Sequence, residues 1–523
     1  MTKPSRPRLE RPAAGDRRTL AACAGLTALL CLAGLASRSL WIDEAVALRI
    51  AQTPGWTVLM SDGGNMPAYY LLLRVWTVLG DSLQVLRLPS ALFATAAVVF
   101  GYQLAFRLFG GRVAAISGVL LTVNSSLITY GQEARSYAMT LMLVTAAWLV
   151  LDVAKERRTV PWFLLWGALN ALAVASHLFS VFLLAAQLVS LAFVASRTLP
   201  WKGLLAGGGV TALGSAPFLA AAAGRGDVQI DWIPPTSATA FRQVVLFLGG
   251  ANFEPSPDLV PRLIAVVVLA ICAAGWIAGI WIAVQAFREN GRSRIAWAHA
   301  VPAIWLTVPL AGAIVASLAA HPLLVPRFFV ALIPAGCMLL ALSLSKVQPR
   351  PVAYAGLALL VAVGLSGVVR SSGHTDWEWR EVAGYLNRVA RPGEAVVVLP
   401  GRQLLALDYA LEHAREAPSF EIISPELTTW RTPEATVYGV SDAFVRTNSP
   451  AGAAADASGR ERFWVVTSDF TRFDGSGRVQ EAFDEAGTFF RALGPGYVVR
   501  SAEAFGTAGG PGRVGVLLVE RGR

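Results

Sequence analysis

Long apolar runs alternate with short polar connections along most of the chain. A membrane-spanning helix needs about 20 apolar residues, and roughly eleven segments approach that length. The predicted spans are residues 19–37, 88–106, 113–130, 136–152, 161–176, 178–196, 203–223, 260–287, 296–319, 323–345 and 351–369. The stretch 66–80 is apolar but shorter, so we expect it to lie at the membrane interface with Arg74 directed toward the headgroups.

Composition supports a membrane protein. Of the 523 residues, 55% are hydrophobic and 15% are charged, whereas a soluble domain carries about 25% charged residues. The four cysteines (Cys23, Cys31, Cys272 and Cys337) all fall inside apolar runs, so they indicate neither a disulfide framework nor a zinc site.

The net charge of +10 is unevenly distributed. From His374 onward there are 16 basic and 20 acidic residues, which leaves 28 basic and 14 acidic residues in the apolar part. This excess lies in alternate short loops, a pattern typical of membrane topology rather than of nucleic-acid binding. It predicts a cytoplasmic N-terminus and an extracytoplasmic C-terminal region. The basic loops contain Arg107 and Arg112; Lys155, Arg157 and Arg158; Arg197 and Lys202; Arg288, Arg292 and Arg294; and Lys346 and Arg350.

The polar tail has the pattern of a small α/β domain. Strands are predicted at 395–399, 463–467, 497–500 and 514–519, helices at 376–391, 403–416 and 480–492, and a loop at 448–460. The predicted fold is therefore an α-helical polytopic membrane protein with a C-terminal extracytoplasmic α/β domain. Residues 1–370, including an outer loop at 38–87, form the first domain, and residues 371–523 form the second.

Two adjacent carboxylates follow the first span, in Trp41-Ile-Asp43-Glu44. Ionised groups at a membrane boundary are costly to desolvate, so the presence of two carboxylates there has to be explained. One reason is a helix start, where acidic residues gain about 0.3–1 kcal/mol from the helix dipole. The other is chemistry, because the amphipathic stretch 44–52 would hold Asp43 at the edge of a polar cavity.

Further polar motifs occur in the predicted outer loops. They include Asn65 and Tyr69 before and within Pro67-Ala-Tyr-Tyr-Leu-Leu-Leu-Arg-Val-Trp76, the stretch Leu86-Arg-Leu-Pro-Ser-Ala-Leu-Phe93, and Tyr130-Gly-Gln-Glu-Ala-Arg-Ser-Tyr137. Together with the Trp-x-Asp-Glu motif, they resemble the GT-C type membrane glycosyltransferases over roughly residues 19–350. The similar branch contains the protein O-mannosyltransferases and the lipid A aminoarabinose transferase. Asn65-Met66-Pro67-Ala68 departs from that branch, which usually has His-Pro-Pro-Leu or a similar sequence there.

The resemblance implies transfer of a mannosyl or pentosyl unit from a polyprenyl-phosphate carrier to an acceptor hydroxyl on the outer face of the cytoplasmic membrane. It also implies that Asp43 is the base that takes the hydroxyl proton. One nucleophile and one displacement imply inversion, and nothing in the sequence requires the covalent, retaining route. The acceptor is a lipid, a polysaccharide or a protein of the cell envelope.

The other candidate residues each have a structural alternative. Glu133 would assist the base or position the acceptor, and Arg135 would bind phosphate through its forked donors, but both could equally cap a hairpin. His177 would contact the carrier phosphate or fill a structural position. Arg327 suits a phosphate ligand, since the positive-inside bias does not explain a basic residue there. The predicted substrate-binding residues are Glu44, Asn65, Tyr69, Gln132, Tyr137, Asp231 and Trp232, although Trp232 could also anchor its loop at the headgroups.

Three further alternatives concern the chemistry and the class of protein. The carboxylates Asp43, Glu44 and Glu133 could hold Mg²⁺ or Mn²⁺, but we expect no obligatory metal or other cofactor. A transporter or flippase of lipid-linked saccharides would place broken helices near the bilayer midplane, often in repeated halves, and the sequence shows neither. A non-catalytic scaffold would not bring Asp43 and Glu133 together.

Overall fold

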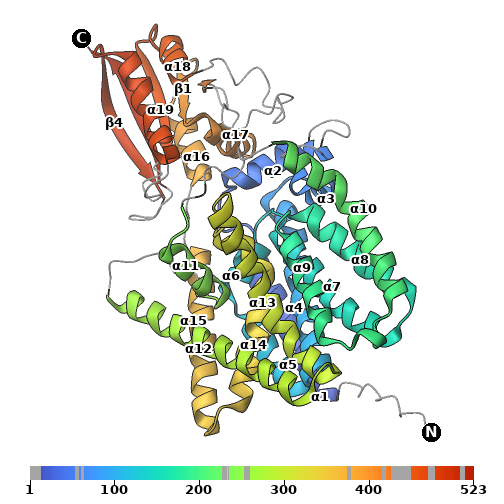
Figure 1. Cartoon of the computed structure of the whole chain (residues 1–523). Helices are drawn as coiled ribbons and strands as arrows, with labels where there is room; N and C mark the ends of the chain where they lie inside the picture. Colours follow the sequence, from blue (N-terminus) through green and yellow to red (C-terminus); the bar gives the residue numbers. More distant parts are fainter. Residues whose placement is uncertain are drawn as a thin grey trace, which may run out of the picture.

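Helices make up the membrane part of the chain, and a mixed sheet forms at its C-terminal end (Figure 1). The computed structural model describes residues 13–52, 58–59, 64–225, 233, 235–251, 259–373, 378–414, 420–425, 449–468, 477–506 and 513–522. In Figure 1 the small C-terminal domain lies beside α2, and the N-terminal end of α1 lies at the opposite end of the helical bundle. The expected fold class, a polytopic helical membrane protein with a C-terminal α/β domain, is confirmed.

The membrane part contains fifteen α-helices among the described residues. They are α1 (Ala14–Ala33), α2 (Ile42–Gln52), α3 (Pro67–Trp76), α4 (Leu83–Phe109), α5 (Gly111–Thr122), α6 (Ser125–Gly131), α7 (Tyr137–Arg157), α8 (Val160–Ser176), α9 (Ser180–Ser190), α10 (Trp201–Arg225), α11 (Ala238–Leu248), α12 (Leu259–Asn290), α13 (Arg294–Ala319), α14 (Ile333–Lys346) and α15 (Arg350–Gly373). Short 3-10 segments include η3 (Thr77–Leu79), η4 (Leu191–Phe193), η5 (Ser196–Thr198) and η6 (Pro326–Leu332).

Seven helices are long and apolar enough to cross a membrane, or eight if the bent pair α5–α6 counts as one span; the search covers the described residues. Shorter apolar helices include α8, α9 with η4, and α11. The number of eleven spans therefore stays a prediction. The expected interruption at His177 is present, because α8 ends at Ser176 and α9 begins at Ser180.

The predicted span 113–130 is broken, with α5 and α6 bent by 58°. Asn124 causes the break, since its side chain caps α6 by accepting from Leu127 N at 3.0 Å. The neighbouring side chains bind the carbonyls at the end of α11. Asn124 Nδ2 donates to Leu248 O at 3.1 Å, and Ser126 Oγ donates to Phe247 O at 2.8 Å. The prediction of one continuous helix over 113–130 was wrong, but the polar groups at this break are occupied by protein.

Small residues allow α8 and α10 to approach closely. A Cβ on Gly167 would lie 2.2 Å from Gly207 O, and one on Gly207 would lie 2.3 Å from Phe163 O. Thr211 Oγ1 donates to Gly167 O at 3.1 Å across the same crossing. Close backbone approach through small residues is the usual way in which helices associate in lipid.

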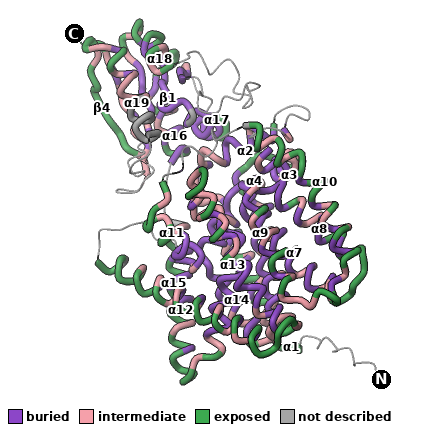
Figure 2. The backbone as a smooth tube through the Cα atoms, viewed as in Figure 1, coloured by how far each residue is buried: buried purple, intermediate pink, exposed green. Residues whose placement is uncertain are grey.

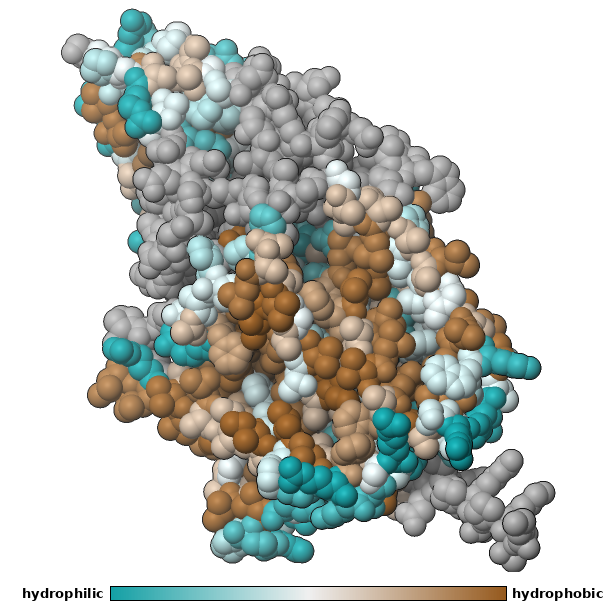
Figure 3. Space-filling model, in the orientation of Figure 1, coloured by the Kyte–Doolittle hydropathy of each residue, from teal (hydrophilic) through white to brown (hydrophobic). Residues whose placement is uncertain are grey.

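Burial and hydropathy separate the inner helices from the outer ones. Buried residues concentrate in α4, α7 and α14, while α10 and α12 are largely exposed (Figure 2). The exposed helical surface is mostly hydrophobic, and hydrophilic residues gather at the end opposite the C-terminal domain (Figure 3). An apolar outer surface is what lipid contact requires, so the chain is a multi-pass membrane protein.

The two ends of the bundle are named here by their acidic residues. The Asp43 end contains α2, the loop between α6 and α7, the break at His177 and η6. The helical rise along α7 from Tyr137 to Asp152 puts the Asp152 end about 22 Å from the Asp43 end.

The C-terminal domain contains a five-stranded sheet in the order β2-β1-β3-β5-β4. Strands β2, β1 and β3 are parallel, and β5 pairs antiparallel with both β3 and β4. Its elements are α16 (Trp379–Val389), β1 (Ala395–Leu399), η7 (Gly401–Gln403), α17 (Leu404–Glu412), β2 (Glu421–Ile423), α18 (Pro450–Ala457), β3 (Arg462–Ser468), α19 (Gly477–Leu493), β4 (Tyr497–Phe505) and β5 (Val514–Arg521).

Two elements of this domain were not predicted. The expected loop at 448–460 contains the helix α18, in which Ser449 accepts from Gly452 N at 3.0 Å and Pro450 occupies the first turn. Both features favour a helix start. The three-residue strand β2 is too short to produce a clear alternating pattern.

Candidate active site

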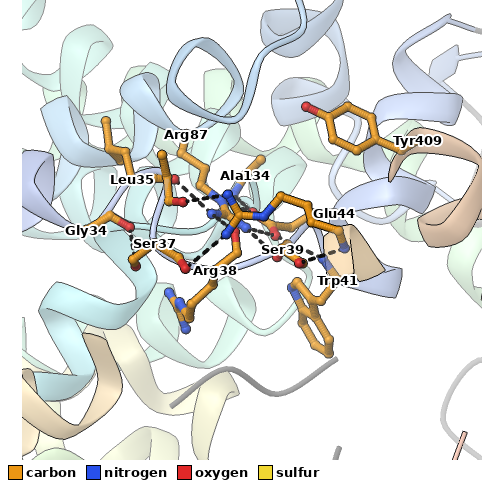
Figure 4. A network of polar contacts seen from close by, with 12 residues as sticks. Gly34, Leu35, Ser37, Arg38, Ser39, Trp41, Glu44, Arg87, Ala134 and Tyr409 are labelled. Atoms are coloured by element: carbon orange, nitrogen blue, oxygen red, sulfur yellow. Dashed lines mark hydrogen bonds and ion pairs between the residues drawn. The ribbon is translucent and has the colours of Figure 1, made fainter. Parts of the chain in front are cut away.

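Arg87 of α4 holds the loop between α1 and α2 in place. Its Nε donates to Glu44 Oε1 at 2.8 Å, and its Nη2 donates to Glu44 Oε2 at 2.6 Å (Figure 4). Its remaining donors reach three backbone carbonyls of the loop, those of Leu35 at 2.8 Å, Arg38 at 2.9 Å and Ser39 at 3.0 Å. Ala134 N also donates to Glu44 Oε1 at 2.7 Å, which ties the α6–α7 loop to the same pair.

Glu44 is fully buried within these contacts. Burial alone would raise the pKa of Glu44, but the Arg87 charge and hydrogen bonds hold that pKa below its ordinary value. Both carboxylate oxygens are occupied by protein donors. Substrate contact by Glu44 stays a prediction, and the contacts seen here fix the residue next to Asp43.

Asp43 is more accessible than Glu44 and lies between two arginines. Its side chain is 20% exposed. Its Oδ2 lies 3.6 Å from Arg135 Nη2 and 3.5 Å from Arg327 Nη1. Arg135 also donates from Nη1 to the Asp43 carbonyl at 3.2 Å. These ion pairs are long, so the carboxylate keeps lone pairs for a further donor.

Glu133 lies in the loop between α6 and α7 and is buried. Its Oε2 has no hydrogen-bond partner among the described residues. Burial raises the pKa of Glu133 to about 7, although Arg38 opposes this shift. Near neutral pH the Glu133 carboxyl group therefore exists in both its protonated and its ionised form.

Arg38 was missed by the sequence reasoning. Its Nε and Nη2 atoms are buried without a hydrogen-bond partner. The guanidinium points away from the Glu44–Arg87 pair (Figure 4). Like Arg327, Arg38 is a basic residue at an end of a span where the positive-inside bias does not explain it. That signal could have identified it.

His177 is buried at the break between α8 and α9. Phe179 N donates to its Nδ1 at 3.2 Å, which leaves the ring proton on Nε2, and Nε2 has no partner. Burial lowers the pKa of His177 to about 3, with further contributions from Arg135 and Arg327. The ring is thus neutral at pH 7 and offers a hydrogen-bond donor.

Aromatic rings line this cluster. The Tyr137 ring centroid lies 5.6 Å from that of His177 and 4.9 Å from that of Tyr130. The Arg135 guanidinium lies 5.7 Å from the centre of the Tyr137 ring. On the other side, Phe328 of η6 lies 5.1 Å from the His177 ring. The tyrosines at the two ends of Tyr130–Tyr137 therefore meet, but only Tyr137 was predicted to belong to the site.

The remaining predicted residues are less central. Gln132 Nε2 donates to Leu30 O at 2.8 Å, so this amide faces α1. Tyr69 of α3 is buried and lies in the field of Glu44, Arg135 and Glu133. Asn65 is half-buried just before α3. Asp231 and Trp232 lie outside the described residues.

No group of three or more His, Cys, Asp or Glu side chains converges as a metal site in the part of the chain that the structure describes. Glu44, one of the three predicted oxygen ligands, is occupied by Arg87 and Ala134. The expectation of no obligatory metal stays a prediction.

Comparisons with known proteins show which fold this arrangement belongs to. A family model described as dolichyl-phosphate-mannose-protein mannosyltransferase matches residues 65–220. The crystal structure of ArnT from Cupriavidus metallidurans bound to undecaprenyl phosphate is 16% identical, with a TM-score of 0.56 over 97% of this chain and 98% of that chain. The chain has the GT-C fold of polytopic membrane glycosyltransferases.

A second GT-C structure is similar over much of the chain. The oligosaccharyltransferase of Archaeoglobus fulgidus in the apo form is 12% identical, with a TM-score of 0.54 over 87% of this chain and 69% of that chain. A search of curated proteins finds no match. The resemblance noted from the motifs is thus confirmed at the level of fold. The matched residues 65–220 include Arg87, Glu133, Arg135 and His177, but they begin after Asp43.

Proposed function

We propose that this GT-C protein transfers a monosaccharide from a polyprenyl-phosphate carrier to an acceptor hydroxyl, with inversion at the anomeric carbon. The observation that carries the proposal is the charge of the cluster at the Asp43 end. Arg135 and Arg327 flank Asp43, and Arg38 has buried donors without partners. Glu44 is already neutralised by Arg87. The cluster therefore has more positive than negative charge and suits a phosphate monoester or diester.

Asp43 is the base in this proposal. The acceptor oxygen attacks the anomeric carbon as its proton passes to the Asp43 carboxylate, and the bond from that carbon to the phosphate oxygen breaks. The electron pair leaves on the phosphate, whose developing charge is stabilised by Arg327 and Arg38. Asp43 is the accessible member of the carboxylate pair, which supports this assignment over Glu44.

Glu133 and His177 have supporting roles. The ionised Glu133 carboxylate accepts a hydrogen bond from the acceptor hydroxyl and orients it, which its unpartnered Oε2 permits. His177 donates from Nε2 to the phosphate or the sugar. Its neutral state fits a donor rather than a proton carrier. Arg135 fixes the Asp43 backbone through its hydrogen bond to the Asp43 carbonyl and adds positive charge.

The Asp43 end is proposed to face outward from the cytoplasmic membrane. The opposite end gathers the basic residues Arg107, Lys155 and Arg294 around Asp152, as expected for the cytoplasmic side. ArnT in the similar structure binds undecaprenyl phosphate. We propose the same carrier class here, with a mannosyl or pentosyl unit as the donor sugar and a lipid, polysaccharide or protein of the cell envelope as the acceptor.

A transport function gains no support from the broken pair α5–α6. The polar side chains Asn124, Ser125 and Ser126 at that break donate to carbonyls at and just after the end of α11, so among the described residues they are occupied by protein.

Sugar transfer from a radiolabelled polyprenyl-phosphate donor to membrane acceptors tests the proposal. Mannosyl and pentosyl donors are compared, with the purified wild type and with Asp43→Asn. The substitution should reduce transfer at least about 100-fold, because it removes the base. Glu156→Gln, at the opposite end of the bundle, is the matched control and should transfer normally. Equal transfer by Asp43→Asn and wild type would contradict the assignment.

A further inference from the structure

The segment that carries Asp43 is held by the C-terminal domain as well as by Arg87. At its N-terminal side, Arg380 of α16 donates to the Ala36 and Ser37 carbonyls, at 3.1 Å from Nη1 and 3.1 Å from Nη2. The backbone N–H of Arg380 donates to Ser39 Oγ at 3.3 Å, and Ser39 Oγ donates to Glu378 Oε2 at 3.4 Å. The loop before α2 is thus fixed to the start of α16.

The C-terminal side of α2 is fixed to α17. Arg49, in the last turn of α2, pairs with Asp408, and its Nη2 also lies 3.6 Å from Glu412 Oε1. The Asp408 side chain is 7% exposed, so this pair is poorly screened by solvent. The same helix, α17, contacts two parts of the membrane domain: Asp408 contacts α2, and Tyr409 contacts the segment before α4.

Tyr409 of α17 and His413, directly after this helix, bind Asp81 just before α4. Tyr409 OH donates to Asp81 O at 2.7 Å, and His413 Nε2 lies 3.2 Å from Asp81 Oδ1. The two rings stack with centroids 4.0 Å apart. Asp81 lies two residues before α4, the helix that supplies Arg87 to the Glu44 pair. The C-terminal domain therefore contacts both α2 and the helix that locks it.

A helix as short as α2 depends on such contacts. It has 11 residues, and isolated helices below about 12–15 residues are marginal in water. A small shift of α2 would move Asp43 relative to Arg135 and Arg327, and misplacement of about 1 Å can slow catalysis about 100-fold.

We propose that the C-terminal domain acts as a clamp on α2, with Arg380 and Asp408 as positioning residues for Asp43. The clamp is defined by the contacts of Arg380 with residues 36–39, of Asp408 with Arg49, and of Tyr409 and His413 with Asp81. The kinetic part of this inference rests on the proposed function, whereas the ordering of α2 does not. A domain that only binds the acceptor would change acceptor specificity without changing the order of α2.

Hydrogen exchange of the full-length protein tests the ordering of α2 directly. Asp408→Asn should raise exchange in peptides covering residues 42–52, and Arg380→Gln should raise it in peptides covering 36–41. In the sugar-transfer assay, each variant should lower kcat about 10- to 100-fold with KM for the donor unchanged, because the phosphate-binding groups are intact. The matched control is Arg500→Gln, whose Nε lies 3.3 Å from Glu520 Oε2 in the far strands of the same domain.

Charge reversal distinguishes positioning from general damage. Arg49→Asp and Asp408→Arg should each loosen α2, and the double variant should recover both the exchange protection and kcat. Unchanged exchange in α2 for Asp408→Asn, or no recovery in the double variant, would overturn the clamp. If exchange responds as expected but no variant, including Asp43→Asn, affects transfer, the clamp stands and the proposed function fails.

Discussion

Two buried carboxylates, Asp152 and Glu133, lie near arginines at opposite ends of the bundle, and they differ in how completely they are satisfied. Asp152 Oδ2 accepts from Arg107 Nε at 2.7 Å and from Arg294 Nη2 at 3.3 Å, and its Oδ1 also pairs with Arg294. Glu133 Oε2 accepts from no group in the part of the chain that the structure describes.

This difference separates a structural cluster from a candidate site. Asp152 pairs with Arg107 and Arg294, and α4, α7 and α13 are joined as a result. Around Asp43, the partnerless atoms of Glu133, Arg38 and His177 belong to three different elements. Buried polar groups in proteins are rarely left unsatisfied, so such a concentration indicates a place for a ligand.

The largest effect away from the proposed base is expected at Asp152. Asp152→Asn removes one partner from a buried ion cluster and should lower the free energy of unfolding by about 3 kcal/mol. Transfer per folded molecule should be unchanged, because the cluster is remote from Asp43. Thermal unfolding in detergent measures the first quantity, and the transfer assay on the folded fraction measures the second. A specific loss of transfer without destabilisation would break the comparison.

The next effect is a pH dependence set by Glu133. The kcat/KM for transfer should rise with pH through about 7, because the ionised carboxylate orients the acceptor. Glu133→Gln should remove this limb and reduce transfer about 10-fold at pH 8, below the 100-fold or larger effect of losing a base.

Glu133 also makes a stability prediction. Its raised pKa means that the folded protein holds a proton that the unfolded chain releases between its ordinary pKa of 4.5 and about 7. Stability from this group is therefore fully present below that window and is lost as pH rises through it. Unfolding midpoints at pH 5 and pH 8 should differ more for wild type than for Glu133→Gln. An identical pH dependence in the two proteins would contradict the role of Glu133.

A smaller effect is expected at His177. Because burial keeps the pKa of His177 near 3, the ring stays neutral and should add no titration between pH 5 and 8. His177→Phe removes the Nε2 donor but keeps an aromatic ring, and should reduce transfer a few-fold, as expected for one neutral hydrogen bond. His177→Gln, which keeps an N–H donor, should recover part of the activity. Full activity of His177→Phe would assign His177 to packing alone.

Much of the fold could be predicted from the sequence, because apolar length and alternation depend on local sequence. The break at Asn124 was not predicted: Asn124, Ser125 and Ser126 interrupt the apolar stretch 113–130, but the bend depends on carbonyls of α11, more than 100 residues away. The helix α18 was missed because a sequence rich in Ala, Gly and Ser is also typical of loops.

The candidate site was predictable in its residue types but not in its roles. Adjacent residues on a helix point in directions about 100° apart, so Asp43 and Glu44 meet different neighbours. The pattern Trp-Ile-Asp-Glu does not indicate which of the two carboxylates is accessible, because Glu44 is paired by Arg87 on another helix. The sequence therefore did not separate Glu44, whose oxygens accept from Arg87 and Ala134, from its neighbour Asp43, and Arg38 was overlooked.

Binding of polyprenyl phosphate to the purified protein tests the central contrast most directly. A ligand that binds the folded state raises the free energy of unfolding, by about 2.7 kcal/mol when the ligand concentration is 100 times its Kd. Arg38→Gln and Arg327→Gln should each weaken binding about 10-fold, as expected for one lost charge-assisted contact, while Arg294→Gln at the Asp152 end should leave the Kd unchanged. Binding that is insensitive to Arg38 and Arg327, or that is weakened by Arg294→Gln instead, would contradict a phosphate site at the Asp43 end.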